Sequence, residues 1–149
     1  MSLFSSLGAS ASGMTAERLR MDVVADNLAN ANTTRTPEGG PFRRRRVVFE
    51  PRADEGFGGA LARARGADGG TGLGGVQVVA IVEDYAPPRR VYDPGHPDAG
   101  RDGYVSMPNI ATVTEMVDMM SATRAYEANV AAVQAAKHMA MKALEIGRG

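Results

Sequence analysis

Near residue 100 the sequence gathers side chains whose types can bind a metal ion. They are Asp93, His96, Asp98 and Asp102. Carboxylate oxygens with an imidazole nitrogen are ligands for several divalent metals. However, Pro94 and Pro97 lie among them, and Asp, Gly and Pro are the residues that build tight turns. A single imidazole between two rigid prolines favours a turn, so we expect no metal here.

A second motif has the spacing of a phosphate-binding loop. Gly70, Gly72 and Gly75 match G-x-G-x-x-G, which binds a dinucleotide when it follows a strand and opens a helix. Here the motif precedes a strand and lies in Gly-rich sequence, so it does not predict a cofactor site. The sequence also contains no Ser-His-Asp set, P-loop or H-E-x-x-H motif. It therefore predicts no enzyme, no cofactor and no small-molecule substrate.

Four consecutive arginines, Arg43 to Arg46, are followed by the apolar residues Val47 to Phe49. A nucleic-acid site needs more positive charge and interleaved aromatic residues, and the formal net charge of the whole chain is zero. We therefore expect a strand with solvated or partner-facing arginines, and no nucleic-acid partner.

Two rival functions remain open to experiment. Salt-dependent affinity for DNA would favour a small module whose basic strand binds nucleic acid or a membrane surface. Near-stoichiometric binding of a nucleotide would instead favour a cofactor-dependent enzyme that uses the glycine-rich loop.

The longest helical pattern runs from Thr112 to about Ile146. Thr112 and Glu115 have the spacing of a capping box, and Gly147 is a suitable stop. An apolar stripe with a 3-4-4 spacing marks one face: Met119, Ala122, Tyr126, Val130, Val133, Lys137, Met141 and Leu144. A second, shorter stripe lies near the start: Val113, Met116, Val117 and Met120. The helix therefore has more than one face to bury.

The N-terminal end carries a heptad pattern. Its members are Phe4, Leu7, Ala11, Met14, Arg18, Met21, Ala25 and Leu28. Gly8 and Gly13 each weaken a helix by about 1 kcal/mol relative to Ala, so we expect residues 1 to about 30 to be largely mobile before assembly. The Asn residues at 30 and 32 compete for backbone hydrogen bonds and predict the end of the helix.

These patterns predict an α+β fold. A helical segment at 1–32 and a long helix at 109–149 are amphipathic and pack as a helical, coiled-coil core. A small β-rich middle domain at 33–108 has strands near 76–82 and 89–92 and a flexible Gly-rich insertion at 53–75. With no Trp, four Phe and four Tyr, the compact core is small, and no apolar run is long enough for a direct membrane span. The helices therefore predict assembly with copies of the chain or its relatives.

Several strings resemble a known family. Residues 12–33 resemble the N-terminal signature of bacterial flagellar rod, hook and hook-associated proteins. Residues 91–99, 103–109 and 115–129 are similar, more narrowly, to the FlgC family of flagellar basal-body (proximal) rod proteins. The first of these strings holds the family's motif turn: Tyr92, Asp93, Pro94, His96, Pro97 and Asp98. The match omits mainly residues 53–75, and Asp26 stands where the family usually has Asn.

The resemblance implies a structural subunit of the proximal rod, which polymerises through its terminal helices into the drive shaft and export tube crossing the periplasm. It also implies export by the flagellar type III apparatus without a cleaved signal peptide. The first positive side chain is Arg18, which agrees with that route. Expected partners are copies of the chain and other rod and basal-body proteins. The heptad seam and the 3-4-4 stripe are the expected assembly interface.

Overall fold

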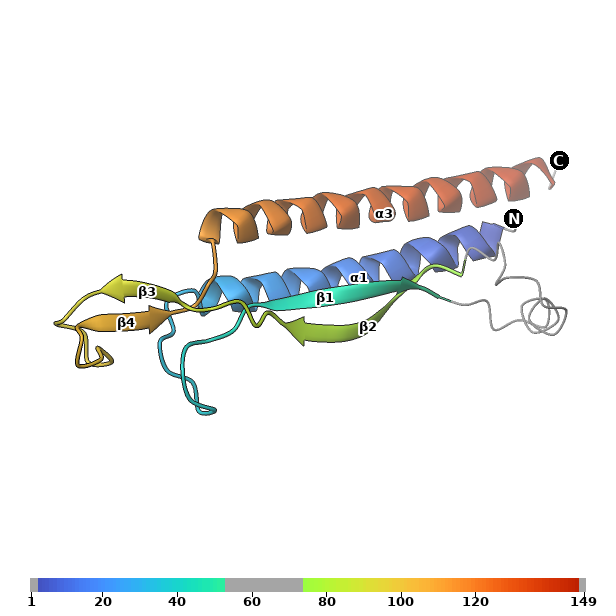
Figure 1. Cartoon of the computed structure of the whole chain (residues 1–149). Coiled ribbons are helices and arrows are strands. Elements are labelled where there is room, and N and C mark those ends of the chain that lie inside the picture. Colours follow the sequence, from blue (N-terminus) through green and yellow to red (C-terminus); the bar gives the residue numbers. More distant parts are fainter. Residues whose placement is uncertain (1–2, 53–73, 148–149) are drawn as a thin grey trace, which may run out of the picture. The chain divides into compact units, whose positions relative to one another are not determined.

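The computed structural model describes residues 3–52 and 74–147 (Figure 1). In chain order its elements are α1 (Leu3–Ala29), β1 (Arg45–Pro51), β2 (Val76–Glu83), β3 (Arg89–Tyr92), β4 (Tyr104–Met107) and α3 (Thr112–Ile146). Two long terminal helices with a small β-rich middle confirm the predicted α+β fold. The predicted Gly-rich insertion falls mostly on residues 53–73, which lie outside the described residues.

Both helices end where the sequence predicts. α3 has 35 residues, and at its end the Gly147 amide donates to the Ala143 carbonyl over 3.1 Å. α1 has 27 residues and stops before Asn30, whose side-chain amide donates to the Asp26 carbonyl at 2.9 Å. An Asn side chain that binds the backbone in this way competes with further helix. The mobility expected for α1 before assembly stays a prediction.

The strands form two sheets of two strands each, β1 with β2 and β3 with β4. The Asp84 amide donates to the Arg44 carbonyl at 2.7 Å, and the Arg52 amide donates to the Gly75 carbonyl at 2.9 Å, as expected of an antiparallel ribbon. β3 and β4 are antiparallel and pair Tyr92 with Tyr104. The sequence did not predict β4.

By its internal contacts the chain divides into two compact units. The first comprises residues 1–18, 49–79 and 123–149, and the second comprises residues 19–48 and 80–122. Each unit combines a part of α1, a part of α3 and a part of the β1–β2 ribbon. The boundaries predicted from the sequence, 1–32, 33–108 and 109–149, follow element type rather than contacts and stay a prediction.

Small side chains dominate the buried positions. In the first unit they are Ala16 and Ala136; in the second they include Val23, Val24, Ala31, Val105, Ile110 and Ala122. Side chains of this size let backbones approach closely. In the first unit, a Cβ built on Gly13 of α1 would lie 2.9 Å from the Asn129 Nδ2 atom of α3. Close helix packing through small residues therefore takes the place of a bulky aromatic core.

Candidate assembly surfaces

The residues considered as metal ligands instead form a turn after β3. The Asp98 amide donates to Nδ1 of His96 at 3.1 Å. The Asp98 carboxylate accepts from Thr34 Oγ1 at 2.8 Å and lies 3.1 Å from the Arg35 guanidinium. Asp102 pairs with Arg90. Across residues 3–52 and 74–147, no group of three or more His, Asp or Glu is placed to hold a metal.

The glycine motif gives no phosphate loop among the described residues. Gly70 and Gly72 lie outside them, and Gly75 directly precedes β2 rather than a helix. Gly75 has a φ of 95°, a conformation that favours glycine. Next to it, the Val76 amide donates to Ser12 Oγ at 3.0 Å, so this position joins β2 to α1 in the first unit.

A buried polar cluster holds the second unit together, and its centre is Glu115 in the first turn of α3. The Glu115 side chain is 1% exposed. Its Oε1 accepts from Arg44 Nε at 2.6 Å, and its Oε2 accepts from Asn27 Nδ2 at 3.0 Å. Asn27 also accepts from the Arg45 amide at 2.8 Å. We call this set of contacts the Glu115 cluster. It connects α1, the start of β1 and α3.

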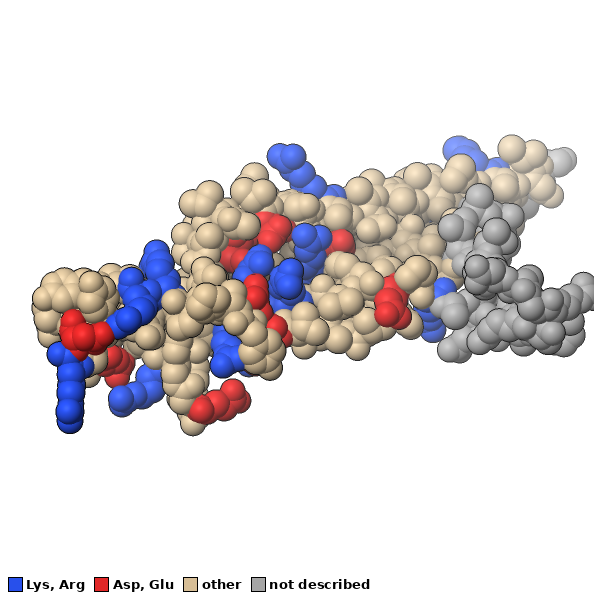
Figure 2. All heavy atoms as spheres, viewed as in Figure 1, with Lys and Arg blue, Asp and Glu red and all other residues tan. Residues whose placement is uncertain are grey.

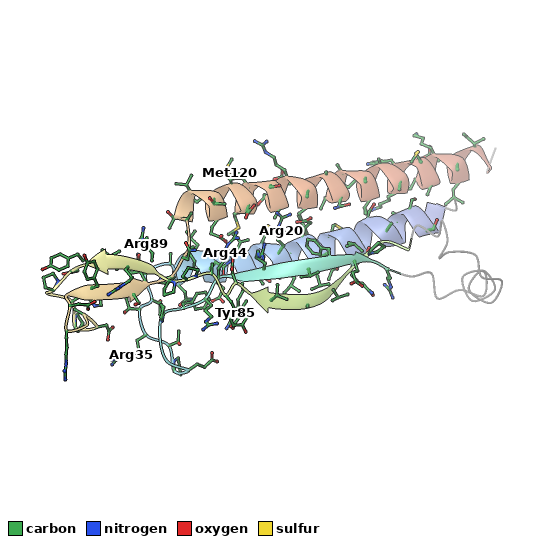
Figure 3. The ribbon with its side chains drawn as sticks, in the orientation of Figure 1. Arg20, Arg35, Arg44, Tyr85, Arg89 and Met120 are labelled. Carbon is green, nitrogen blue, oxygen red and sulfur yellow. The ribbon has the colours of Figure 1, made fainter. Side chains whose placement is uncertain are left out.

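Asp118 extends the cluster by one turn of α3. Arg44 Nη2 lies 3.2 Å from one Asp118 oxygen, and Arg20 Nη2 of α1 lies 3.7 Å from the other. Figure 3 shows Arg20 and Arg44 on the side of α3 that faces α1. A buried carboxylate needs both a counter-charge and hydrogen bonds. The cluster supplies both, and thereby fixes which turn of α3 lies against α1.

The prediction of solvated arginines is wrong for Arg44, whose side chain is 21% exposed. Arg43, in contrast, is exposed and lies 4.6 Å from the centre of the Tyr85 ring. The capping-box spacing correctly placed Glu115 at the start of α3, but both of its oxygens bind other elements. The sequence feature that could have indicated the cluster is a pair of acidic residues, Glu115 and Asp118, which are three residues apart on one face of α3. Spacing alone could not show which arginine meets them.

The predicted heptad seam of α1 faces away from the buried side of that helix. The buried side is marked by Ala16, Val23 and Asn27, and at about 100° per residue the seam lies roughly opposite. Its members Ala11, Arg18 and Ala25 are exposed; Leu7, Met14, Met21 and Leu28 are half-buried. The Phe4 side chain lies outside the described residues. The fold of one chain thus fills one face of α1 and leaves the seam partly open.

The 3-4-4 stripe of α3 is covered in part. Ala122 is fully buried, whereas Met141 and Leu144 are 41% and 69% exposed. Between these extremes, the half-buried members are Met119, Tyr126, Val130 and Val133, and Lys137 is exposed. The chain therefore covers the first part of the stripe and leaves its last turns open.

The second stripe of α3 is open throughout. The exposed fractions are 73% for Val113, 52% for Met116, 58% for Val117 and 56% for Met120. Figure 3 shows Met120 on the side of α3 away from Arg20 and Arg44. In Figure 2 the visible surface of α3 is largely uncharged. Contiguous apolar surface of this kind marks an interaction site. Among the described residues, no helix has the length and hydropathy needed to cross a bilayer.

Long terminal helices with open apolar faces define a structural subunit of an assembly rather than an enzyme. Comparison with known proteins identifies the assembly. A family model described as flagella basal body rod protein matches residues 7–35. Another, described as flagellar basal body rod FlgEFG protein C-terminal, matches residues 101–146.

Relatives that match this chain over nearly its full length identify the family more narrowly among the rod proteins. The flagellar basal-body rod protein FlgC of Borreliella burgdorferi is 45% identical over 100% of both chains. The Bacillus subtilis protein of the same name is 48% identical, over 99% of this chain and 100% of its own. The Escherichia coli O157:H7 protein is 39% identical over the same shares. The chain therefore belongs to the FlgC family of flagellar basal-body rod proteins, and it is a structural rod subunit.

Proposed function

We propose that this rod subunit polymerises through its terminal helices, with copies of itself and with other rod proteins, into the proximal part of the rod. The assembled helices form the inner wall of a drive shaft and export tube that crosses the periplasm. The subunit reaches that place through the flagellar type III export apparatus, without a cleaved signal peptide. The proposed interface is the α1 seam with the 3-4-4 stripe of α3.

The observation that carries this proposal is the pair of opposite apolar faces on α1. Ala16 and Val23 are buried within the chain, while Met14 and Met21 on the other side stay partly open. Covering apolar surface stabilises a complex by about 25 cal/mol per Å². An isolated helix gains little stability without such packing. Assembly gives the open face of α1 the packing that one chain does not provide.

The open end of the α3 stripe allows a direct test with a matched control. Leu144 is 69% exposed, and its neighbour Ala143 is also exposed but points about 100° away around the helix. Leu144→Asp should leave the free chain folded, because the new carboxylate stays in water. In the assembled rod the same carboxylate would be buried, at a cost of several kcal/mol.

We therefore expect Leu144→Asp to give a folded, soluble chain that is missing from isolated basal bodies. Ala143→Asp, which adds the same charge, should be incorporated. Circular dichroism of the purified chain and immunoblots of basal bodies measure the two properties. Normal rods and motility with Leu144→Asp would show that this stripe is not the packing surface.

A further inference from the structure

Two charged residues on the open side of α1 lack a counter-charge among the residues that the structure describes. Arg18 and Asp22 are both exposed, and within that part of the chain neither side chain forms an ion pair. Arg20 and Asp26 on the same helix, in contrast, pair with groups on other elements. Arg18 and Asp22 are therefore available to another molecule.

The positions of these two residues on α1 would allow them to meet each other. They are four residues apart, which corresponds to about 40° around the helix and about 6 Å along it. The buried side of α1, marked by Ala16 and Asn27, lies roughly opposite. A pair with this spacing is more favourable when the acidic residue comes first in the chain, and here the order is reversed. Their side chains accordingly form no pair in the structure.

Assembly through the α1 seam would remove Arg18 from water. Arg18 is the charged member of the seam, and Lys137 is the charged member of the 3-4-4 stripe. The two surfaces of the proposed interface therefore carry positive charge only. A guanidinium always remains charged, and burying a charge is costly unless a counter-charge accompanies it. The neighbour that covers Arg18 must supply a carboxylate from outside the seam and the stripe.

Asp22 offers such a carboxylate beside a hollow of about 460 Å³ in the second unit. The other residues that line the hollow are Val23, Asp26, Arg45, Ile81 and Glu83. Arg45 lies 3.4 Å from the Asp26 carboxylate and 3.8 Å from that of Glu83. Asp22 is the lining carboxylate that remains unpaired among the described residues. Those residues hold no group of three ligands placed for a metal ion, so an organic cation such as a guanidinium suits the hollow.

We propose that Arg18 of one copy enters the hollow of the next copy in the rod and pairs there with Asp22. This inference rests on the proposed function, because it requires copies of the chain to assemble. The contact is head-to-tail. The first copy still offers its own Asp22 and the second its own Arg18, so the contact can continue from copy to copy. Because an Arg–carboxylate pair has a narrow geometry, the contact also fixes how far neighbouring subunits are shifted along each other.

Charge reversal in two differently tagged chains tests this contact. Arg18→Asp alone and Asp22→Arg alone each bring like charges together, so each should lower the amount of the chain in isolated basal bodies about tenfold or more. When the two chains are produced together in one cell, opposite charges meet wherever the chains alternate. Both chains should then be incorporated again, as immunoblots of the two tags would show.

The mixture distinguishes a contact between copies from a pair within one helix. If Arg18 served Asp22 of its own chain, the two single variants could not help each other, and only a chain with both changes would be incorporated. That result would overturn the contact. Recovery of Arg18→Asp by Glu127→Arg, and not by Asp22→Arg, would also overturn it, because Glu127 is an exposed carboxylate on α3.

The control reverses two charges with the same spacing on another element. Arg46 and Glu50 are exposed on β1, so Arg46→Asp and Glu50→Arg should each be incorporated normally. Losses equal to those of the α1 variants would overturn the contact, since any change of charge would then have the same effect. Absence of the unaltered chain from basal bodies would instead refute the proposed function.

Cysteine cross-linking gives a second measurement if circular dichroism shows that a reversed charge prevents folding. The chain contains no cysteine, so a tagged Arg18→Cys chain and an untagged Asp22→Cys chain can be produced together. A short bis-maleimide reagent should join them in isolated basal bodies and should not join Arg18→Cys to Glu50→Cys. Absence of the mixed adduct, or an adduct of either chain with a different rod protein in its place, would overturn the contact and leave the proposed function intact.

Discussion

Arg44 and Glu115 are 71 residues apart in the chain, yet Arg44 Nε lies 2.6 Å from Glu115 Oε1. The pair joins the start of β1 to the first turn of α3, and Asn27 of α1 binds the other Glu115 oxygen. A short, charge-assisted hydrogen bond has a narrow geometry. Sliding α3 by one turn would move Glu115 out of reach of both partners. The pair therefore sets the register of α3 within the second unit.

The first prediction concerns removal of Arg44, the positive charge that pairs with the buried Glu115 carboxylate. Arg44→Ala leaves the Glu115 carboxylate, 1% exposed, without its guanidinium, and breaking a buried ion pair in this way costs about 3–5 kcal/mol. Urea unfolding should show a loss of that size in the free energy of unfolding. Arg43→Ala is the control, because Arg43 is exposed, and it should change the free energy by at most about 1 kcal/mol. A loss below about 1 kcal/mol for Arg44→Ala would contradict the role given to the pair.

The two long helices follow from local signals, whereas the Glu115 cluster does not. The 3.6-residue periodicity, Asn30 and Gly147 define where α1 and α3 end, because helix ends depend on neighbouring residues. The pairing of Arg44 with Glu115 depends on how β1 meets α3. Four adjacent arginines give four candidates, and nothing in their spacing distinguishes them.

The heptad seam of α1 shows a second limit of what a sequence pattern can predict. Its spacing correctly marks an apolar face of α1, but the chain buries the other side, at Val23 and Asn27. Asn27 is polar and therefore absent from any hydrophobic pattern. Periodicity reveals an apolar face; it does not reveal whether the chain itself or a neighbouring subunit covers that face.

The second prediction compares two glycines in α1. A Cβ at Gly8 would meet nothing within 4 Å, whereas one at Gly13 would lie 2.9 Å from Asn129 Nδ2. Gly8→Ala should raise the free energy of unfolding by about 0.5–1 kcal/mol, the helix-propensity difference. Gly13→Ala should gain less or lose stability, because Asn129 must shift away from the Ala125 carbonyl that it binds at 3.0 Å. Thermal unfolding of both variants checks this order, and a larger gain for Gly13→Ala would contradict the close approach.

The third prediction concerns the connection between β1 and β2. Arg52 and Gly75 are joined by a backbone hydrogen bond of 2.9 Å, so the chain re-enters the described structure beside the point where it leaves. Replacing residues 54–73 by Asn-Gly should preserve folding, since loop-closure entropy changes slowly with length and this dipeptide favours hairpins. Urea unfolding should give a midpoint close to that of the unaltered chain. Loss of cooperative unfolding would show that the replaced segment belongs to the core.

The fourth prediction concerns Asp102 beside the β3–β4 hairpin. Desolvation acts to raise the pKa of this carboxyl. Backbone hydrogen bonds at Asp102 and Tyr104 and the Arg90 guanidinium outweigh it, so the pKa of Asp102 lies below the ordinary 3.8. A carboxyl with a lowered pKa stabilises the fold above its unfolded pKa, and this stabilisation is lost as the pH falls through the folded value.

A carboxyl-detected NMR titration should therefore find the Asp102 midpoint below 3.8. Arg90→Gln should raise it towards the ordinary value. Arg89→Gln is the control, since the Arg89 guanidinium contacts the Met107 sulfur at 3.8 Å, and it should leave the midpoint nearly unchanged. An equal response to both substitutions would exclude a specific effect of Arg90.

The last prediction tests the α1 seam at a position where the free chain should tolerate change. Ala25 belongs to the seam and is exposed. Ala25→Asp should cost the free chain only the helix-propensity difference, up to about 0.7 kcal/mol. In a rod whose subunits pack along this seam, the carboxylate would lose its water and find no counter-charge, at a cost of several kcal/mol in every copy. Ala25→Asp should therefore fold normally and fail to enter basal bodies.

Thr15→Asp is the comparison for this variant, because Thr15 is exposed on the same helix and lies at the edge of the seam, about 80° from Ala25 and about 40° from Ala11 around the axis. It introduces the same charge on the same element and should be incorporated. Far-ultraviolet circular dichroism of each purified chain separates misfolding from failed assembly, and swimming assays report the functional consequence. If Ala25→Asp and Thr15→Asp both support normal motility, the seam is not buried in the rod. If both fail, the surface of α1 that neighbouring subunits cover extends beyond Ala25 to the edge of the seam at Thr15.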